Sequence, residues 1–189
     1  MLIRKAHPED AETIATYILL AMEEILYQFI GEKSREKAKQ FLTNLICKKN
    51  NQYSYENCWV MELNKEVVAV AVVYDGALLQ TLRAPVAQEI KTMFNKDFNP
   101  ENETEAGEFY IDSIAVSPQQ QGKGFGAKLL QFLIDEYVTK RNETLGLLVE
   151  KENANAKKLY LKLGFKIVGE KTLAGKNMEH FVVGYRSFQ

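Results

Sequence analysis

The sequence has almost no excess of either charge. Its 24 basic and 25 acidic residues leave a formal net charge of −1, so no long-range field draws the protein to nucleic acid or to anionic lipid. We therefore expect neither nucleic acid nor a membrane as a partner.

Cysteine and histidine are also scarce. Only Cys47 and Cys58 are present, and the histidines are His7 and His180. These residues are too few for a disulfide framework or for a zinc site of usual spacing. We expect no metal, and we interpret both thiols as reduced packing residues.

Long apolar runs are missing as well. The longest uninterrupted one, residues 67–74, is too short to span a bilayer. The first residues, MLIRKAHPEDAE, carry charges where a secretory signal needs its apolar segment. The expected location is therefore cytoplasmic.

What remains is ordinary globular composition. The chain has 189 residues, of which 46% are apolar and 26% charged, enough to bury one sizeable core. We expect a single domain over residues 1–189, without internal repeats.

Periodicity predicts alternating strands and helices. Strands are expected at residues 2–6, 58–63, 67–74, 109–116, 144–149, 165–171 and 178–186. Helices are expected from His7 to about Ile25, from the N-cap Ser34 to Ile46, and at residues 78–94, 125–140 and 155–163. This order, which ends in a hairpin, predicts an α/β (α+β) fold with a mixed sheet. Residues 75–107, partly helical despite Pro85, are interpreted as an insertion.

The most informative segment is a glycine turn between a predicted strand and a predicted helix. It consists of Gln121, Gly122, Lys123, Gly124, Phe125 and Gly126. Free N–H groups at a helix start, with the positive end of the helix dipole, form an anion site. Glycine lets a phosphate approach the main chain and permits φ > 0.

Three other interpretations of this turn are possible. A dinucleotide-binding fingerprint should follow the first strand of a long doubly wound sheet, yet only 63 residues follow Gly126. A P-loop needs Ser or Thr after Lys123, where Gly124 stands. A plain tight turn remains open.

At these residues the sequence resembles the GNAT superfamily of N-acetyltransferases, whose signature Q/R-x-x-G-x-G/A matches residues 121–126. Residues 110–118 are similar to the family's fourth strand. Residues 153–165 match its N-x-x-A-x-x-L-Y-x-x-x-G-F pattern at every stated position. The long segment 75–107 departs from the short turn that family members often have there, so relatives give little guidance on the substrate.

The resemblance implies a mostly antiparallel sheet of six to seven strands, with helices on both faces and splayed fourth and fifth strands. It also implies acetyl-CoA as cosubstrate. Pantetheine would pair with the main chain at Ile114, Ala115 and Val116, pyrophosphate would bind the amides of 121–126, and Asn153 would contact the coenzyme arm. The tetrahedral oxyanion would take a backbone N–H near Val116.

Acetyl transfer to an amine needs a base. An alkyl amine of pKa about 10.4 is neutral in roughly one molecule in 2,500 at pH 7, which corresponds to about 4.6 kcal/mol. Asp112 is preferred, because a carboxylate within an apolar strand needs a reason to be there. It is expected on one face with Tyr110, Ile114 and Val116. A structural hydrogen bond is the alternative role for Asp112, and Glu150 and Glu108 remain candidate bases.

Tyr160 is the candidate proton donor to the leaving thiolate. A phenol of pKa about 10 suffices for a thiolate of pKa about 8.5. Tyr160 would also contact the coenzyme. Its i, i+3, i+4, i+7 stripe with Ala156, Leu159 and Leu163 equally fits plain core packing.

The predicted loop before residue 109 contains Glu101, Glu103, Glu105 and Glu108 without Lys or Arg. We hypothesise that it attracts a cationic amine; a solvated linker is the alternative.

The leading hypothesis is an N-acetyltransferase acting on a small-molecule amine or a peptide amine by direct attack in a ternary complex. The alternative is a catalytically weak coenzyme A-binding regulatory module. A dinucleotide-binding oxidoreductase is a third possibility. A monomer or homodimer is expected, the latter through exposed edges of the last strands.

Overall fold

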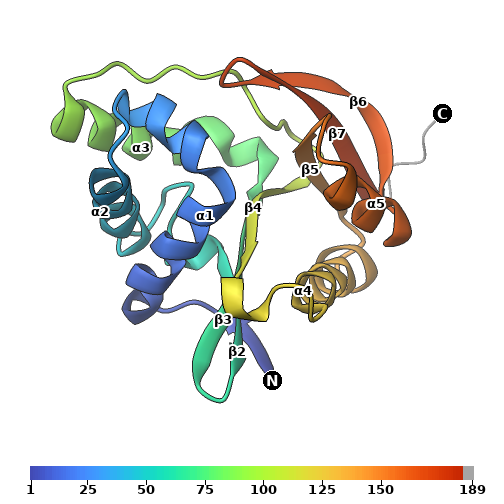
Figure 1. The fold of residues 1–189 in the computed structure, drawn as a ribbon. Helices are drawn as coiled ribbons and strands as arrows, with labels where there is room; N and C mark the ends of the chain where they lie inside the picture. Colours follow the sequence, from blue (N-terminus) through green and yellow to red (C-terminus); the bar gives the residue numbers. More distant parts are fainter. Residues whose placement is uncertain (185–189) are drawn as a thin grey trace.

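Seven strands form one mixed sheet in the computed structural model, which describes residues 1–184 (Figure 1). The strand order is β1-β2-β3-β4-β5-β7-β6. Only β4 and β5 run parallel, and the other neighbours are antiparallel. The strands are Leu2–Lys5 (β1), Cys58–Leu63 (β2), Glu66–Asp75 (β3), Phe109–Val116 (β4), Thr144–Glu150 (β5), Lys166–Leu173 (β6) and Lys176–Gly184 (β7). The predicted sheet is confirmed; the end of its last strand, residues 185 and 186, lies outside the described residues.

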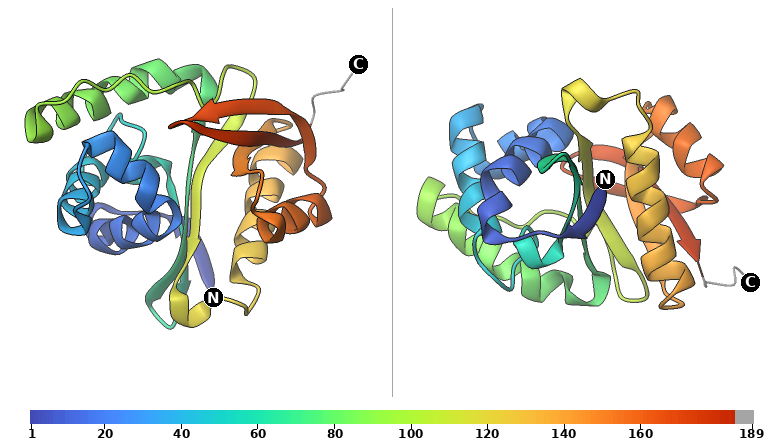
Figure 2. Two further views of the ribbon diagram at one scale, coloured as in Figure 1. Left: turned by 45° about the horizontal axis from the view of Figure 1, so that its top comes forward. Right: turned by 90° about the horizontal axis from the view of Figure 1, so that it is seen from below.

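Helices cover both faces of this sheet, as predicted. One face carries α1 (Ala11–Ile30), α2 (Arg35–Ile46) and α3 (Leu79–Phe94). The other carries α4 (Phe125–Leu133), which continues as a π-helical segment Ile134–Thr139, and α5 (Ala154–Lys162) (Figure 2). Each face has its own apolar core, with Ile14 and Phe41 in the first and Leu129 and Phe181 in the second.

Local signals account for several boundaries. The Ser34 hydroxyl accepts a hydrogen bond from the Lys37 amide at 3.3 Å, which confirms the predicted N-cap of α2. Asn64 and Lys65 form the two-residue turn of the β2–β3 hairpin, with φ of 52° and 68°. The packing role predicted for Cys47 is wrong, because this free thiol is exposed while Cys58 is buried.

The segment between β3 and β4 is organised rather than loop-like. It contains α3, which runs through Pro85 and packs against α2 and α1. Residues 95–108 then return across the top of the molecule to β4 (Figure 1). The predicted helix at residues 78–94 is confirmed to within one residue at its start.

The parallel strands β4 and β5 part after a short paired region. Their register consists of Phe109 with Leu145, Tyr110 with Gly146, and Ile111 with Leu147. Beyond Ile111, β4 stays paired with β3 as far as Val116 but has no register partner in β5. The predicted splay of the fourth and fifth strands is therefore present.

A β-bulge sits at the start of the splayed region. Ile111 pairs with Val73 and Ser113 with Val72, so Asp112 is an extra residue on β4. After the bulge the faces are exchanged: Ile114 packs on the side of α4, whereas Tyr110 and Asp112 lie on the side of α1. The expectation that Asp112 shares a face with Ile114 and Val116 is therefore wrong.

Helix α1 bends at Met22, whose φ of −142° and ψ of 37° are not helical. The stretch Pro8–Ile30 is the one segment among the described residues that is long and apolar enough to cross a membrane. Ile14, Ile18 and Leu26 within it are nevertheless fully buried, and α1 packs against β3, β4 and α2. This pattern is typical of a core helix.

Candidate active site

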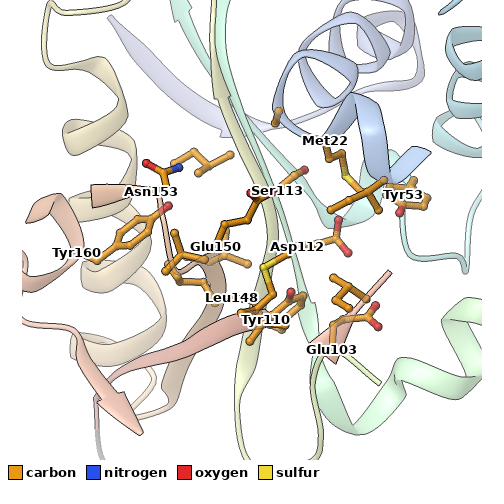
Figure 3. A pocket seen from close by; sticks show the side chains of 18 of the residues that line it. Met22, Tyr53, Glu103, Tyr110, Asp112, Ser113, Leu148, Glu150, Asn153 and Tyr160 are labelled. Atoms are coloured by element: carbon orange, nitrogen blue, oxygen red, sulfur yellow. The ribbon is translucent and has the colours of Figure 1, made fainter. Parts of the chain in front are cut away.

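A pocket of about 230 Å³ lies where β4 and β5 part. Its walls come from both faces of the sheet: Met22 and Phe29 on the α1 side, and Asn153 and Tyr160 on the α5 side. Figure 3 shows Asp112 and Tyr160 on opposite sides of the strands, with the tyrosine hydroxyl pointing toward them. The splay thus joins the two faces through one cavity.

Asp112 is the buried acid of this pocket. Its Oδ2 accepts from the Tyr74 hydroxyl at 3.3 Å, and its buried Oδ1 has no partner among the described residues. Burial, followed by the negative charge of Glu103, raises the pKa of Asp112 to about 7. A carboxyl with this pKa changes its protonation near neutral pH, as a general base requires.

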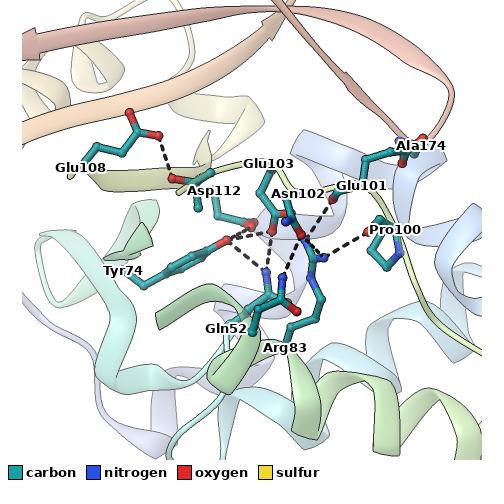
Figure 4. Close-up of polar contacts among 12 residues, drawn as sticks. Gln52, Tyr74, Arg83, Pro100, Glu101, Asn102, Glu103, Glu108, Asp112 and Ala174 are labelled. Carbon is teal, nitrogen blue, oxygen red and sulfur yellow. Dashed lines mark hydrogen bonds and ion pairs between the residues drawn. The ribbon is translucent and has the colours of Figure 1, made fainter. Parts of the chain in front are cut away.

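Asp112 is next to a hydrogen-bonded network of Gln52, Tyr74 and Glu103 (Figure 4). Gln52 Nε2 donates to the Tyr74 hydroxyl at 3.0 Å and to Glu103 Oε1 at 2.7 Å. The Tyr74 hydroxyl has one proton to donate, and Glu103 Oε1, at 2.9 Å, is nearer than Asp112. The hydrogen bond from Tyr74 lowers the pKa of Asp112, but burial and the negative charge of Glu103 outweigh it.

The segment 75–107 supplies the charged pair of this network. Arg83 on α3 forms a buried ion pair with Glu103, and its guanidinium also donates to the Pro100 and Glu101 carbonyls at 3.1 Å each. Sequence reasoning missed Arg83 as a site component. Its position among the buried Leu79, Leu82 and Val86 of α3 was the available signal, because an arginine on an apolar face needs an internal partner.

The acidic loop before β4 is only partly exposed. Glu103 is 5% exposed and paired, and Glu108 is 2% exposed. Glu101 and Glu105 are exposed, and Glu101 accepts from the Ala174 amide at 3.2 Å. Since Glu103 and Glu108 are buried with internal partners, the loop is not a fully solvated linker. The hypothesis that the loop attracts a cationic amine stays a prediction.

The other two candidate bases are less suited than Asp112. Glu108 accepts from Thr104 at 2.7 Å and pairs with His180 at 2.8 Å, and it does not line the pocket. Glu150 does line the pocket, but its side chain is 43% exposed and forms an ion pair with Lys176 at 2.6 Å. Geometry therefore favours Asp112.

Tyr160 reaches the pocket from α5. Its ring packs against Phe165 and Phe181, with centroids 5.7 and 5.9 Å away. Burial raises its pKa to about 12, so the phenol stays protonated at neutral pH and can donate a proton. The core and catalytic interpretations are compatible here, because the ring is packed while the residue lines the cavity.

The glycine turn lies exposed at the start of α4. Gly122 and Gly124 have φ of 75° and 81°, and a Cβ at either position would meet no atom within 4 Å. This open space, beside the unpaired first-turn amides of α4, fits a phosphate group. Gly126 differs, because a Cβ there would make only ordinary contact with Val116, at 3.5 Å.

The remaining predicted coenzyme residues lie along the splay. Ile114, Ala115 and Val116 are in register with β3, while the β5 side of this stretch has no strand partner in the described chain. Gln121 donates to the Val116 carbonyl at 3.2 Å, and Lys123 to Gln120 at 3.0 Å. These contacts connect the turn to the end of β4.

Asn153 has a structural role that was not predicted from the sequence. Its Oδ1 accepts from the Ala156 amide at 3.1 Å and so caps α5. The side chain also lines the pocket. Because the cap uses only the oxygen, the Nδ2 group remains a donor that could face a ligand.

Comparisons with known proteins agree with this geometry. Residues 21–165 match the Acetyltransferase (GNAT) family. A crystal structure of an acetyltransferase superposes with a TM-score of 0.82 at 29% identity, covering 97% of this chain and 99% of that one. An N-acetyltransferase from Staphylococcus aureus Mu50 gives 0.86 at 23% identity, covering 97% and 100%, which shows the fold.

Curated relatives match over shorter stretches. Spermidine N(1)-acetyltransferase of Escherichia coli K12 is 41% identical over 58 residues, which are 30% of this chain and 31% of the relative. The [Ribosomal protein bS18]-alanine N-acetyltransferase of Salmonella typhimurium is 49% identical over 53 residues, 28% and 36% respectively. The chain thus matches about a third of the length of these relatives.

A mixed sheet split between two parallel strands, with an exposed glycine turn on one side and a buried acid on the other, defines an acyltransferase-like class of protein. The family match spans most of the sequence. The chain belongs to the acetyltransferase (GNAT) family.

Proposed function

We propose that the protein is an acetyl-CoA-dependent N-acetyltransferase that moves an acetyl group to a primary amine by direct attack. The observation that carries the proposal is the parting of β4 and β5 beyond Ile111 and Leu147. This opening connects Asn153 and Tyr160 on one side of the sheet with Asp112 on the other.

The residues of the turn and of β4 suit the coenzyme. Amides at the start of α4 would bind its pyrophosphate, with Gly122 and Gly124 leaving room for close approach. The unpaired side of β4 at Ile114, Ala115 and Val116 would pair with pantetheine, and Asn153 would donate to it. When bound, the coenzyme supplies the acetyl group as a thioester.

Asp112 acts as the base in this proposal. It takes a proton from the acceptor ammonium, directly or through one water, and so frees the nitrogen lone pair. A bond then forms between that nitrogen and the acetyl carbon. A backbone N–H near Val116 would stabilise the oxyanion.

Tyr160 completes the transfer. As the bond between the acetyl carbon and sulfur breaks, its hydroxyl hydrogen-bonds to and protonates the leaving thiolate, and the phenolate takes the second proton that the acylated nitrogen releases. The raised pKa of Tyr160, about 12, keeps the phenol protonated at neutral pH, so a hydrogen donor faces the sulfur. No covalent enzyme intermediate is needed.

The matched relatives support an amine acceptor, since one is named for spermidine and the other for an alanine of a ribosomal protein. Location in the cytoplasm, a single domain, and a monomeric or homodimeric state stay predictions.

Acetyl-CoA consumption over a panel of amines and peptides tests the proposal. We expect amine-dependent release of coenzyme A together with the acetylated amine by mass spectrometry. Saturable coenzyme binding without turnover on the whole panel would favour the regulatory module instead. Saturable NAD(P) binding with no protection by coenzyme A would contradict both.

A further inference from the structure

Apolar side chains form much of the acceptor side of the pocket, whose lining also includes the hydroxyl-bearing Tyr53, Tyr110 and Ser113. Met22, Ile25 and Phe29 come from α1. Met178 of β7 stands directly opposite Glu150 of β5 in the register, so both project from the same face of the sheet. These aliphatic and aromatic groups offer no hydrogen-bonding atoms other than a weak thioether acceptor.

Among the acidic side chains on this side, Asp112 alone has no cationic partner in the described chain. Three acids line the pocket, namely Glu103, Asp112 and Glu150, and no Lys, Arg or His stands among its lining residues in the described chain. Arg83 neutralises Glu103, and Lys176 pairs with Glu150. Asp112 has only the Tyr74 hydroxyl. The acceptor side therefore suits a single positive charge.

Space is also limited. The cavity of about 230 Å³ includes the end next to Tyr160, where the thioester must fit. Pockets for drug-sized ligands usually measure roughly 300–1,000 Å³. The part of the acceptor that lies beside the acetyl group must therefore be compact.

We propose that the acceptor is a primary amine with one positive charge and one compact apolar substituent, and that Met22 (labelled in Figure 3), Ile25 and Phe29 hold this substituent. This inference rests on the proposed acetyltransferase function and narrows its substrate. The second ammonium of a diamine or polyamine would lie among these apolar side chains without a free carboxylate, and burying an unpaired charge is costly. A peptide would bring several amide groups, and Ile25 and Phe29 offer them no hydrogen-bonding atom.

A competition assay with the intact protein tests the acceptor class. Acetyl-CoA turnover is measured with 3-methylbutylamine and 2-phenylethylamine, against spermidine and a peptide with an N-terminal alanine. We expect kcat/KM for the two apolar monoamines to exceed that for spermidine by at least about tenfold. Faster turnover of spermidine or of the peptide would overturn this inference and leave the transferase function standing.

A pair of variants of α1 sharpens the test. Ile25→Glu places a second carboxylate in the wall and should shift kcat/KM toward spermidine by about tenfold or more relative to 3-methylbutylamine. Leu20→Glu is the matched control, because Leu20 is 41% exposed on the same helix and does not line the pocket. It should leave the ratio unchanged.

The outcomes separate the two proposals. An unchanged ratio in a folded Ile25→Glu protein, or an equal change in Leu20→Glu, would contradict the assigned wall. If Ile25→Glu does not fold, as judged by circular dichroism, the panel on the unmodified protein decides alone. Absence of acetyl-CoA consumption with every amine would overturn the proposed function and this inference with it.

Discussion

Asp112 differs from the other carboxylates around the pocket because burial, rather than a cationic partner, sets its ionisation. The folded protein holds its pKa at about 7, against an ordinary value of 3.8. Between about pH 4 and pH 7 the folded state therefore keeps a proton that the unfolded state loses. Stability from this group is present below pH 4 and is lost as the pH rises toward 7.

Asp112→Asn should remove this pH dependence. Above pH 7 we expect the variant to unfold less readily than the parent. The difference in free energy of unfolding between variant and parent should shrink by up to about 1.4 kcal/mol for each unit that the pH falls from 7 to 4. Urea unfolding at four pH values measures it. Glu105→Gln, at an exposed position of the preceding loop, is the control; a pH-independent difference for Asp112→Asn would contradict the assigned ionisation.

The same variant should lose activity if Asp112 is the base. With saturating amine, kcat of the parent should rise about tenfold per pH unit below its inflection and level off above it. Asp112→Asn should lower kcat by about 10²–10⁴-fold and flatten that limb. The ordinary amine pKa of about 10.4 lies well above this window. Full turnover of the variant would exclude Asp112 as the base.

Tyr160→Phe separates the two roles of the tyrosine. The ring contacts with Phe165 and Phe181 remain, so stability and coenzyme affinity should change little. Loss of the proton donor should lower kcat by about 10²-fold, within the range for general acids. Isothermal titration with acetyl-CoA and steady-state kinetics check the two parts; a variant with full turnover would leave Tyr160 only its packing role.

At the scale of elements, the sequence predicted the strands and helices well because each carries a strong period or cap. Ser34 marks the start of α2, and runs rich in β-branched and aromatic residues mark β2 and β3. The bulge at Asp112 could not be predicted, since it depends on how β4 pairs with β3. The bend of α1 at Met22 likewise lacks a Pro or Gly signal in the sequence.

The segment between β3 and β4 illustrates the same limit for the candidate site. Its helix was predictable, but the pairing of Glu103 with Arg83 joins residues 20 positions apart in a conformation set by tertiary packing. Glu103, in a polar stretch, gave no sign that it would be buried. The glycine turn and Tyr160, by contrast, belong to local patterns and were found.

Arg83→Met should destabilise the protein because it leaves Glu103 buried without its cation. At pH 8 we expect a loss of about 3–5 kcal/mol in the free energy of unfolding. The double variant Arg83→Met with Glu103→Gln should recover most of it, since the uncompensated charge is gone. Lys91 lies on the same helix as Arg83 and forms an exposed ion pair with Asp97. Lys91→Met breaks this pair and should change the free energy of unfolding by less than about 1 kcal/mol. Equal losses for Arg83→Met and Lys91→Met would mean that the buried pair is not important.

At the scale of the whole molecule, the residues of the candidate site come from both faces of the split sheet. The α1, α2 and α3 face contributes the acid and the apolar walls, and the α4 and α5 face contributes the glycine turn and the tyrosine. Neither half alone encloses the pocket. The family pattern could predict this division, but the acceptor wall depends on the bent α1 and on the segment before β4, which local motifs do not describe.

Binding of acetyl-CoA should stabilise the entire fold, because the ligand would contact both halves of the sheet. At 100 times its dissociation constant the ligand should add about 2.7 kcal/mol to the free energy of unfolding, seen as a rise in the midpoint of thermal unfolding. Gly124→Ala should reduce this rise, because a Cβ would project into the open space where phosphate is expected and φ is 81°.

Gly175→Ala is the matched control: its φ is 75°, it also has open space, and it lies in the β6–β7 turn. Both variants carry similar left-handed strain, about 1–2 kcal/mol, so their unliganded proteins should lose similar stability. Only Gly124→Ala should lose the response to acetyl-CoA; an equal response in both variants would show that the turn does not bind the coenzyme.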